Sequence, residues 1–68
     1  MSRVLEKLDR VLELLVERER TFDELKAETS LSDELLNLVI DFFVAHDFAT
    51  KDNNLIRITD SGRKFLEL

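Results

Sequence analysis

The spacing of hydrophobic residues changes near residue 49, and this change constrains the fold more than any other feature of the chain. Before residue 49 the hydrophobic residues recur every three or four positions, which is typical of amphipathic helices. After it, Leu55, Ile56 and Ile58 are interrupted by Arg57, as in a strand with one outward side chain. The sequence therefore predicts a mainly α domain whose only sheet is a small β-hairpin.

Three helices are expected before this change. The first covers residues 2–18 and carries one apolar stripe, formed by Val4, Leu5, Leu8, Val11, Leu12 and Leu15. An amphipathic helix on a globular core and a short dimeric coiled coil both fit this stripe. The second helix begins at a capping box, Thr21 with Glu24, and ends near residue 29. The third has Ser32 as its N-cap and runs to about residue 46.

A hairpin and a fourth helix complete the expected fold. Residues 49–51 and 55–59 are the strands, and residues 52–54 form a three-residue turn, since Asp and Asn tolerate a left-handed backbone. Thr59 caps a last short helix that carries Phe65, Leu66 and Leu68. The expected core consists of Leu12, Leu15, Leu25, Leu31, Leu36, Val39, Phe43 and Ile58.

Chain length and composition make association an expected property. Sixty-eight residues form one small domain, residues 1–68, and a chain of this size buries only about 60% of its unfolded surface. Small domains are often stabilised by disulfides, metals or oligomer contacts, and this chain has no Cys and one His. We therefore expect a homodimer, with neither a metal nor a cofactor.

The charges of the chain bear on its location and on its partners. Charged residues interrupt the N-terminal segment, so we expect no signal peptide. The longest apolar run, residues 42–45, is too short for a membrane span, and we expect a cytoplasmic protein. The net charge is −5, and residues 31–49 hold four acidic residues and no Lys or Arg. A nucleic-acid-binding protein normally shows a basic face, because phosphate contacts supply most of its non-specific affinity.

Three short segments, taken together, resemble the winged helix-turn-helix regulators of archaea and bacteria. They are residues 22–25 (FDEL), residues 29–32 (TSLS) and residues 58–66 (ITDSGRKFL), the last similar to the "LT-x-x-G-x-x-x-L" ending that follows the wing. The resemblance covers nearly the whole chain. It implies a three-helix core, a wing, a C-terminal helix and DNA binding in transcription regulation; the wing expected here is short.

The sequence departs from this family at two positions. Asp47 stands where the family commonly has a left-handed Gly after the third helix. The turn of the wing is short and contains the acidic Asp52, where the family often has a long and basic wing.

The third helix is the one that would read DNA. At about 100° per residue, one face holds the core residues Leu36, Val39, Ile40 and Phe43. Base reading uses Arg, Lys, Asn or Gln, and Asn37 alone qualifies on the other side. That side instead carries Glu34, Asp41 and a second apolar stripe of Leu35, Leu38, Phe42 and Ala45. The first helix or the wing of the same chain, a second copy or another protein would cover this stripe.

Two functions follow, and the first leads because most domains that resemble this one serve it, while the second is the alternative. The first is a transcription-regulator module that binds duplex DNA weakly and with low specificity. A small set of cations could contact its phosphates: Arg18, Arg20, Lys26, Lys51, Arg57, Arg63 and Lys64. Its expected DNA contacts are Lys51, Arg57, Arg63, Lys64 and Asn37. The second is a protein-interaction or dimerisation module that does not bind DNA. Its expected interface residues are Leu35, Leu38, Phe42, Ala45, Val4, Leu5 and Leu8.

An enzymatic role is not expected. The chain has no Cys or Tyr, one His and one Gly, so neither a Ser/His/Asp arrangement nor a phosphate-binding loop is evident. No small-molecule substrate is suggested. We expect His46 to be a partly buried structural residue, because the family usually places a core Leu at this position.

Overall fold

The computed structural model describes the backbone of residues 3–67 and the side chains of residues 6–67. In chain order, the elements are α1 (Arg3–Glu17), β1 (Arg20–Thr21), α2 (Phe22–Thr29), α3 (Asp33–Ala45), β2 (Ala49–Asp52), β3 (Leu55–Ile58) and α4 (Asp60–Glu67). The expected helix start at Ser2 and the expected helical residue Leu68 lie outside the described residues. The prediction of a mainly helical chain with a small antiparallel sheet is confirmed.

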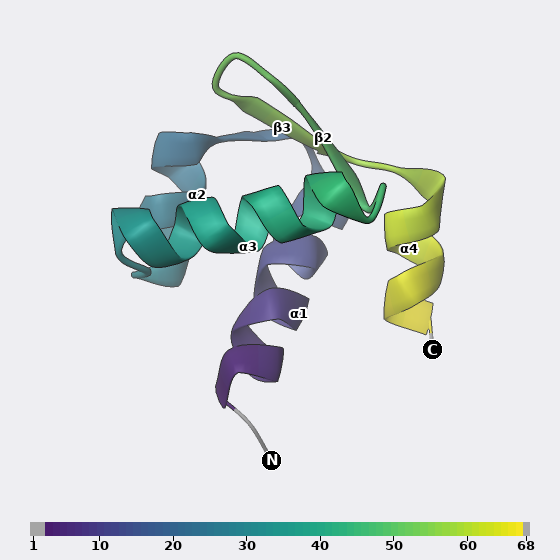
Figure 1. The fold of residues 1–68 in the computed structure, drawn as a ribbon, viewed down its shortest axis with the longest axis horizontal. Coiled ribbons are helices and arrows are strands. Elements are labelled where there is room, and N and C mark those ends of the chain that lie inside the picture. Colours follow the sequence, from purple (N-terminus) through teal and green to yellow (C-terminus); the bar gives the residue numbers. More distant parts are fainter. Residues whose placement is uncertain (1–2, 68) are drawn as a thin grey trace.

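Helix α1 is the central element of the fold. It contacts both α2 and α4, which flank it on opposite sides, while α3 crosses in front of it (Figure 1). The hairpin of β2 and β3 lies at the end of the molecule opposite the start of α1, as Figure 1 shows. The first turns of α1 therefore project away from the sheet.

Short polar side chains begin three of the helices, as their positions in the sequence predict. The Thr21 hydroxyl accepts a hydrogen bond from the Glu24 amide at 3.1 Å, and the Glu24 carboxylate accepts one from the Thr21 amide at 3.0 Å. This is a complete capping box at the start of α2. Ser32 caps α3 through the Leu35 amide at 3.2 Å. Thr59 accepts from the Gly62 amide at 3.1 Å at the start of α4.

The sheet has three antiparallel strands in the order β1-β3-β2. Thr50 pairs with Arg57 as predicted, but the turn holds two residues rather than three, because Asp52 is still paired with Leu55. Asn53 supplies the left-handed conformation, with φ of 57°. The prediction that the hairpin is the only sheet was wrong, since residues 20–21 pair with residues 55–56.

The core contains all the predicted residues except Ile58, which is partly buried. Ile56 is fully buried instead. Both isoleucines lie on the same face of β3, but Ile56 has a paired neighbour on each side, whereas Ile58 is the last residue of the strand. Val11, Leu14, Ile40 and Ala49 complete the set of buried hydrophobic residues in the described part of the chain.

A tight joint connects the end of α3 to the start of α4. Asp47 adopts the left-handed conformation expected for it, with φ of 61°. The Phe48 carbonyl accepts a hydrogen bond from the Thr59 amide at 3.0 Å. A Cβ atom on Gly62 would collide with that carbonyl oxygen and would lie 2.7 Å from Cγ1 of Ile58. The glycine of the C-terminal motif is therefore required by close packing rather than by its backbone angles.

Candidate interaction surface

The outward side of α3 exposes a row of hydrophobic side chains, which we call the outer α3 stripe: Leu35, Leu38, Phe42 and Ala45. The exposed fraction is 66% for Leu38, 43% for Phe42 and 37% for Leu35. The opposite side of the helix, with Leu36, Val39, Ile40 and Phe43, is buried as predicted. The alternative in which α1 or the hairpin covers the stripe within one chain was wrong, because these side chains stay exposed.

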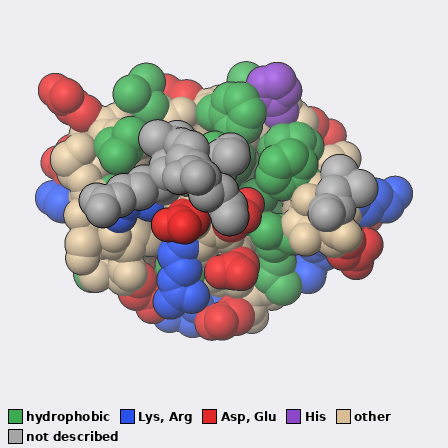
Figure 2. Space-filling model, turned by 90° about the horizontal axis from the view of Figure 1, so that it is seen from below, with side chains coloured by type: hydrophobic (Ala, Val, Ile, Leu, Met, Phe, Trp, Pro, Cys, Tyr) green, Lys and Arg blue, Asp and Glu red, His purple; other side chains and the backbone are tan. Residues whose placement is uncertain are grey.

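Aromatic rings extend the stripe towards α4. The Phe42 ring centre lies 4.4 Å from that of His46 and 6.5 Å from that of Phe48, and the Phe48 ring lies 4.7 Å from that of Phe65. Figure 2 shows hydrophobic groups gathered on the face seen from the α1 end of the molecule, with the histidine beside them. The outer α3 stripe is therefore part of a wider apolar surface.

His46 does not have the partly buried position that was predicted for it. Its side chain is exposed. His46 is the C-cap of α3, and its amide donates to the Phe42 carbonyl at 3.1 Å. Phe48, two residues later, packs against the core in its place.

The three interface candidates of α1 differ from those of α3. Leu8 is partly buried and packs against the chain's own core. The side chains of Val4 and Leu5 lie outside the described residues. The structure thus brings Leu35, Leu38, Phe42 and Ala45 onto one open surface, and leaves only part of Leu8 available.

The predicted DNA contacts do not form one basic surface. Lys51 is opposite Ile56 and Thr50 is opposite Arg57, so Lys51 and Arg57 point to opposite faces of the sheet. The Arg57 guanidinium also pairs with Glu19, with Nε 2.5 Å from the carboxylate oxygen. Arg63 and Arg57 do line the same shallow pocket of about 330 Å³, beside Arg18. Asn37 is exposed on α3, whereas Lys51 and Arg57 lie on the hairpin and Arg63 lies on α4.

The other cations that were considered for phosphate binding also form ion pairs with carboxylates. Arg18 pairs with Glu24 at 2.8 Å, and Lys26 pairs with Asp33 at 2.7 Å. The hydrogen bond from Arg18, helped by that from the Thr21 amide, lowers the pKa of the Glu24 carboxyl from 4.5 to about 2. The same hydrogen bond, together with the negative charge of Glu24, raises the pKa of Arg18. These ion pairs reduce the positive potential available to a phosphate backbone.

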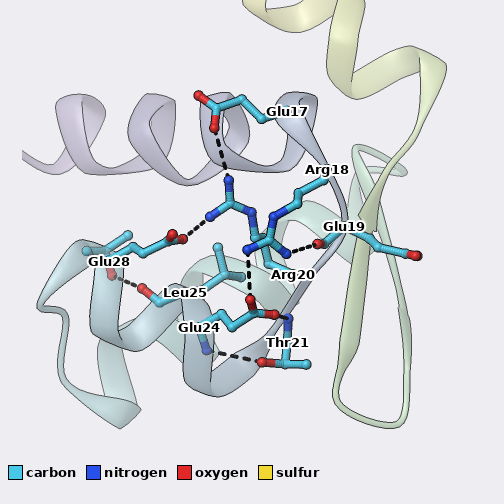
Figure 3. Close-up of polar contacts among 9 residues, drawn as sticks. Glu17, Arg18, Glu19, Arg20, Thr21, Glu24, Leu25 and Glu28 are labelled. Carbon is cyan, nitrogen blue, oxygen red and sulfur yellow. Dashed lines mark hydrogen bonds and ion pairs between the residues drawn. The ribbon is translucent and has the colours of Figure 1, made fainter.

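Arg20 is the most buried of these cations, and its burial was not predicted from the sequence. Its side chain is 4% exposed and reaches two carboxylates, Glu17 at 3.0 Å and Glu28 at a shorter distance. Figure 3 shows it between the end of α1 and α2, next to the Arg18 pair. Its Nε atom has no hydrogen-bond partner among the described residues. Only the i,i+3 spacing of Glu17 and Arg20 could have indicated one of these pairs.

Lys51, Arg63 and Lys64 are the cations among the predicted DNA contacts that remain available. All three are exposed, and none forms an ion pair with a residue that the structure describes. Within residues 3–67 no helix has the length and apolar character needed to cross a membrane. The same residues contain no group of three or more His, Asp or Glu side chains placed to hold a metal ion.

These features define a small, mainly helical domain with a three-stranded antiparallel sheet and an exposed apolar helix. The chain belongs to the same family as an uncharacterized protein of Archaeoglobus fulgidus. The two are 30% identical over all 68 residues of this chain, which span 76% of the relative. No protein-family model and no solved structure matches the chain.

Proposed function

We propose that this chain is a protein-interaction module of winged-helix form, and that it binds protein through the outer α3 stripe. The observation that carries the proposal is the exposure of Leu35, Leu38 and Phe42 on the helix that would otherwise read DNA. Exposed apolar surface of this kind, bordered by charged residues such as Glu34 and Asp41, is typical of protein-binding sites.

The magnitudes favour packing over base reading by α3. Covering the exposed parts of Leu38 and Phe42 is worth roughly 2 to 3 kcal/mol per chain, since 66% and 43% of these residues are exposed. An exposed ion pair contributes only about 0 to 1 kcal/mol. In a major groove, the stripe would stay largely wet while Glu34 and Asp41 faced phosphate and base edges. A protein surface can cover the hydrophobic side chains, and it need not place Glu34 and Asp41 beside negative charge.

Weak DNA binding is the second candidate, and it depends on three residues. Lys51, Arg63 and Lys64 are exposed and form no ion pair within the described part of the chain, so they remain available to phosphates. About three phosphate contacts give a slope of roughly −3 for the logarithm of affinity against the logarithm of salt concentration. Such binding would discriminate little between sequences, because phosphate contacts carry no sequence information.

A fluorescence titration of two unrelated DNA duplexes with the full chain, at low and at physiological salt, separates these functions. We expect no saturable binding to either duplex at low salt. Saturable binding that is equal for both duplexes and is lost in Lys51→Glu/Lys64→Glu would instead establish the second candidate. Sequence-selective binding lost in Asn37→Ala would show that α3 reads bases, and would overturn the proposal.

A further inference from the structure

On the basis of the proposed function, we infer that the partner of the outer α3 stripe is a second copy of this chain. The two α3 helices pack antiparallel about a twofold axis. Three observations support this arrangement: the spacing of the stripe residues, the sizes of their side chains and the exposure of the helix along its length.

The spacing of the stripe is that of a helix–helix seam. Leu35, Leu38, Phe42 and Ala45 follow one another at intervals of three, four and three residues, which are the a and d positions of two heptads. All four are exposed in one chain. A helix of this length, 13 residues, is about 20 Å long. The stripe therefore offers four layers of contact to another helix.

The side-chain sizes favour antiparallel over parallel packing. With the twofold axis near the middle of the stripe, Leu35 meets the partner's Ala45 and Leu38 meets the partner's Phe42, and the same two contacts repeat beyond the axis. Each layer then joins a larger side chain to a smaller one. A parallel pair would place Phe42 on the partner's Phe42 and leave a gap between the two alanines. Antiparallel packing also opposes the two helix dipoles favourably.

The charges predict that the pairing is weak and that salt strengthens it. Asp41 borders the stripe, and in the antiparallel arrangement it lies close to the partner's Asp41 across the twofold axis. Each copy also carries a net charge of −5. Added salt screens this repulsion. A two-helix contact is smaller than the roughly 800 Å² per partner of a standard interface, so we expect dissociation constants of roughly 10 to 100 µM.

Sedimentation equilibrium from 10 to 500 µM, at low and high salt, measures this pairing. The average mass should rise from 8.0 kDa towards 16.0 kDa, twice the chain mass, and should rise at lower concentration in high salt. Leu38→Glu should weaken the pairing by about tenfold or more, because it places a charge at the centre of the seam. Asp41→Asn should strengthen it by roughly two- to fivefold.

Val44 provides a matched control on the same helix. It is 42% exposed, nearly the same as Phe42, but it points to a different side of α3. Val44→Glu should leave the mass distribution unchanged. A loss of pairing in Val44→Glu equal to that in Leu38→Glu would show that the outer α3 stripe is not the interface, and would overturn the inference.

Cysteine crosslinking tests the orientation directly, because the chain has no cysteine of its own. The double variant Leu35→Cys/Ala45→Cys should form disulfide-linked dimers under mild oxidation, since residue 35 shares a layer with the partner's residue 45. Either single variant should not, because its two copies lie about 15 Å apart along the helix axis. Efficient dimers from Leu35→Cys alone would establish a parallel pair and overturn the proposed geometry.

The failure of this inference is distinguishable from the failure of the proposed function. A native chain that keeps a mass of 8.0 kDa at 500 µM in high salt overturns pairing between copies. It leaves the protein-interaction proposal standing, with a different protein as partner. That proposal fails only if the DNA titration shows saturable binding. The sign of the salt effect also separates the two, because salt weakens DNA binding and strengthens the pairing.

Discussion

Two regions of this molecule differ in whether their side chains find partners within the chain. Where α1, β1 and α2 meet, Arg18 and Arg20 form ion pairs with Glu24, Glu17 and Glu28 of the same chain; we call this group the arginine joint. On the outer α3 stripe, hydrophobic side chains are left open to solvent. The guanidinium groups of the arginine joint thus have carboxylate partners within the chain, whereas the hydrophobic side chains of the stripe have no cover among the described residues.

This difference indicates where a partner contributes most. A cation already paired with a carboxylate gains little from a phosphate, because the new contact first has to replace the old one. An exposed leucine or phenylalanine gains its full burial energy from any apolar surface that covers it. Changes at the packed joints should therefore alter the stability of the chain and not its association. Changes on the stripe should do the reverse.

The largest expected effect on stability is that of Gly62→Ala. The added methyl group collides with the Phe48 carbonyl oxygen and with Ile58, so α4 has to move away from the end of α3. We expect a loss of roughly 2 to 4 kcal/mol, less the gain of about 1 kcal/mol that alanine brings to a helix. Urea unfolding measures the loss. Ser61→Ala, at the exposed neighbouring position, is the control and should change little.

The second effect, at the arginine joint, is that of Arg20→Ala. It leaves two carboxylates without their cation and removes a buried side chain, at a cost of roughly 1 to 3 kcal/mol. The lower part of this range is favoured because the side chains of Glu17 and Glu28 are 65% and 39% exposed and can turn to water.

Arg20→Met is the informative companion to this variant, because it retains most of the buried side-chain volume. It should cost less than Arg20→Ala. Equal losses in the two variants would mean that the ion pairs, and not the packing, dominate at this site. Neither variant should change the concentration at which two copies pair, as sedimentation at matched folded fraction would show.

The sequence predicted those parts of the fold that depend on local chemistry. The helix starts at Thr21, Ser32 and Thr59 were correct, because a capping side chain acts within three residues of itself. The outward direction of Leu38 was also correct, because helical periodicity decides it. The left-handed conformation at Asp47 was expected from the family resemblance, because that family commonly has a left-handed Gly after the third helix.

The features that were missed depend on contacts between distant residues. β1 has only two residues and no periodicity of its own, and it is a strand because residues 55–56 lie beside it. The Arg57 pair joins residues 38 positions apart, which a reading of the sequence cannot place. His46 was expected to be partly buried because the family usually places a core Leu at this position, but its side chain is exposed at the C-cap of α3.

The third prediction concerns acid stability at the arginine joint. The folded pKa of Glu24 is about 2, below the ordinary value of 4.5, so its interaction stabilises the chain above pH 4.5. That contribution is lost as the pH falls from about 4.5 towards 2. Glu24→Gln keeps an acceptor for the Thr21 amide but removes the charge. We expect the variant to lose less stability than the native chain between pH 5 and about pH 2.5.

Glu13→Gln is the control for this measurement. Glu13 is exposed on α1 and forms no ion pair with a described residue, so its replacement should leave the pH dependence close to that of the native chain. Thermal unfolding followed by circular dichroism across this pH range makes the comparison. Identical curves for Glu24→Gln and the native chain would show that the Arg18 pair contributes nothing measurable to folding.

The smallest expected effect on stability is that of Leu38→Gln, and it tests the comparison most directly. Leu38 is 66% exposed, and glutamine has nearly the helix propensity of leucine, so the change at 10 µM should stay within about 0.5 kcal/mol. At 500 µM the native chain should gain thermal stability because pairing favours the folded state, and the variant should not. A loss above about 1 kcal/mol at 10 µM would mean that Leu38 packs within its own chain. In that case the outer α3 stripe, like the arginine joint, would have its contacts within one chain, and the two regions would no longer differ.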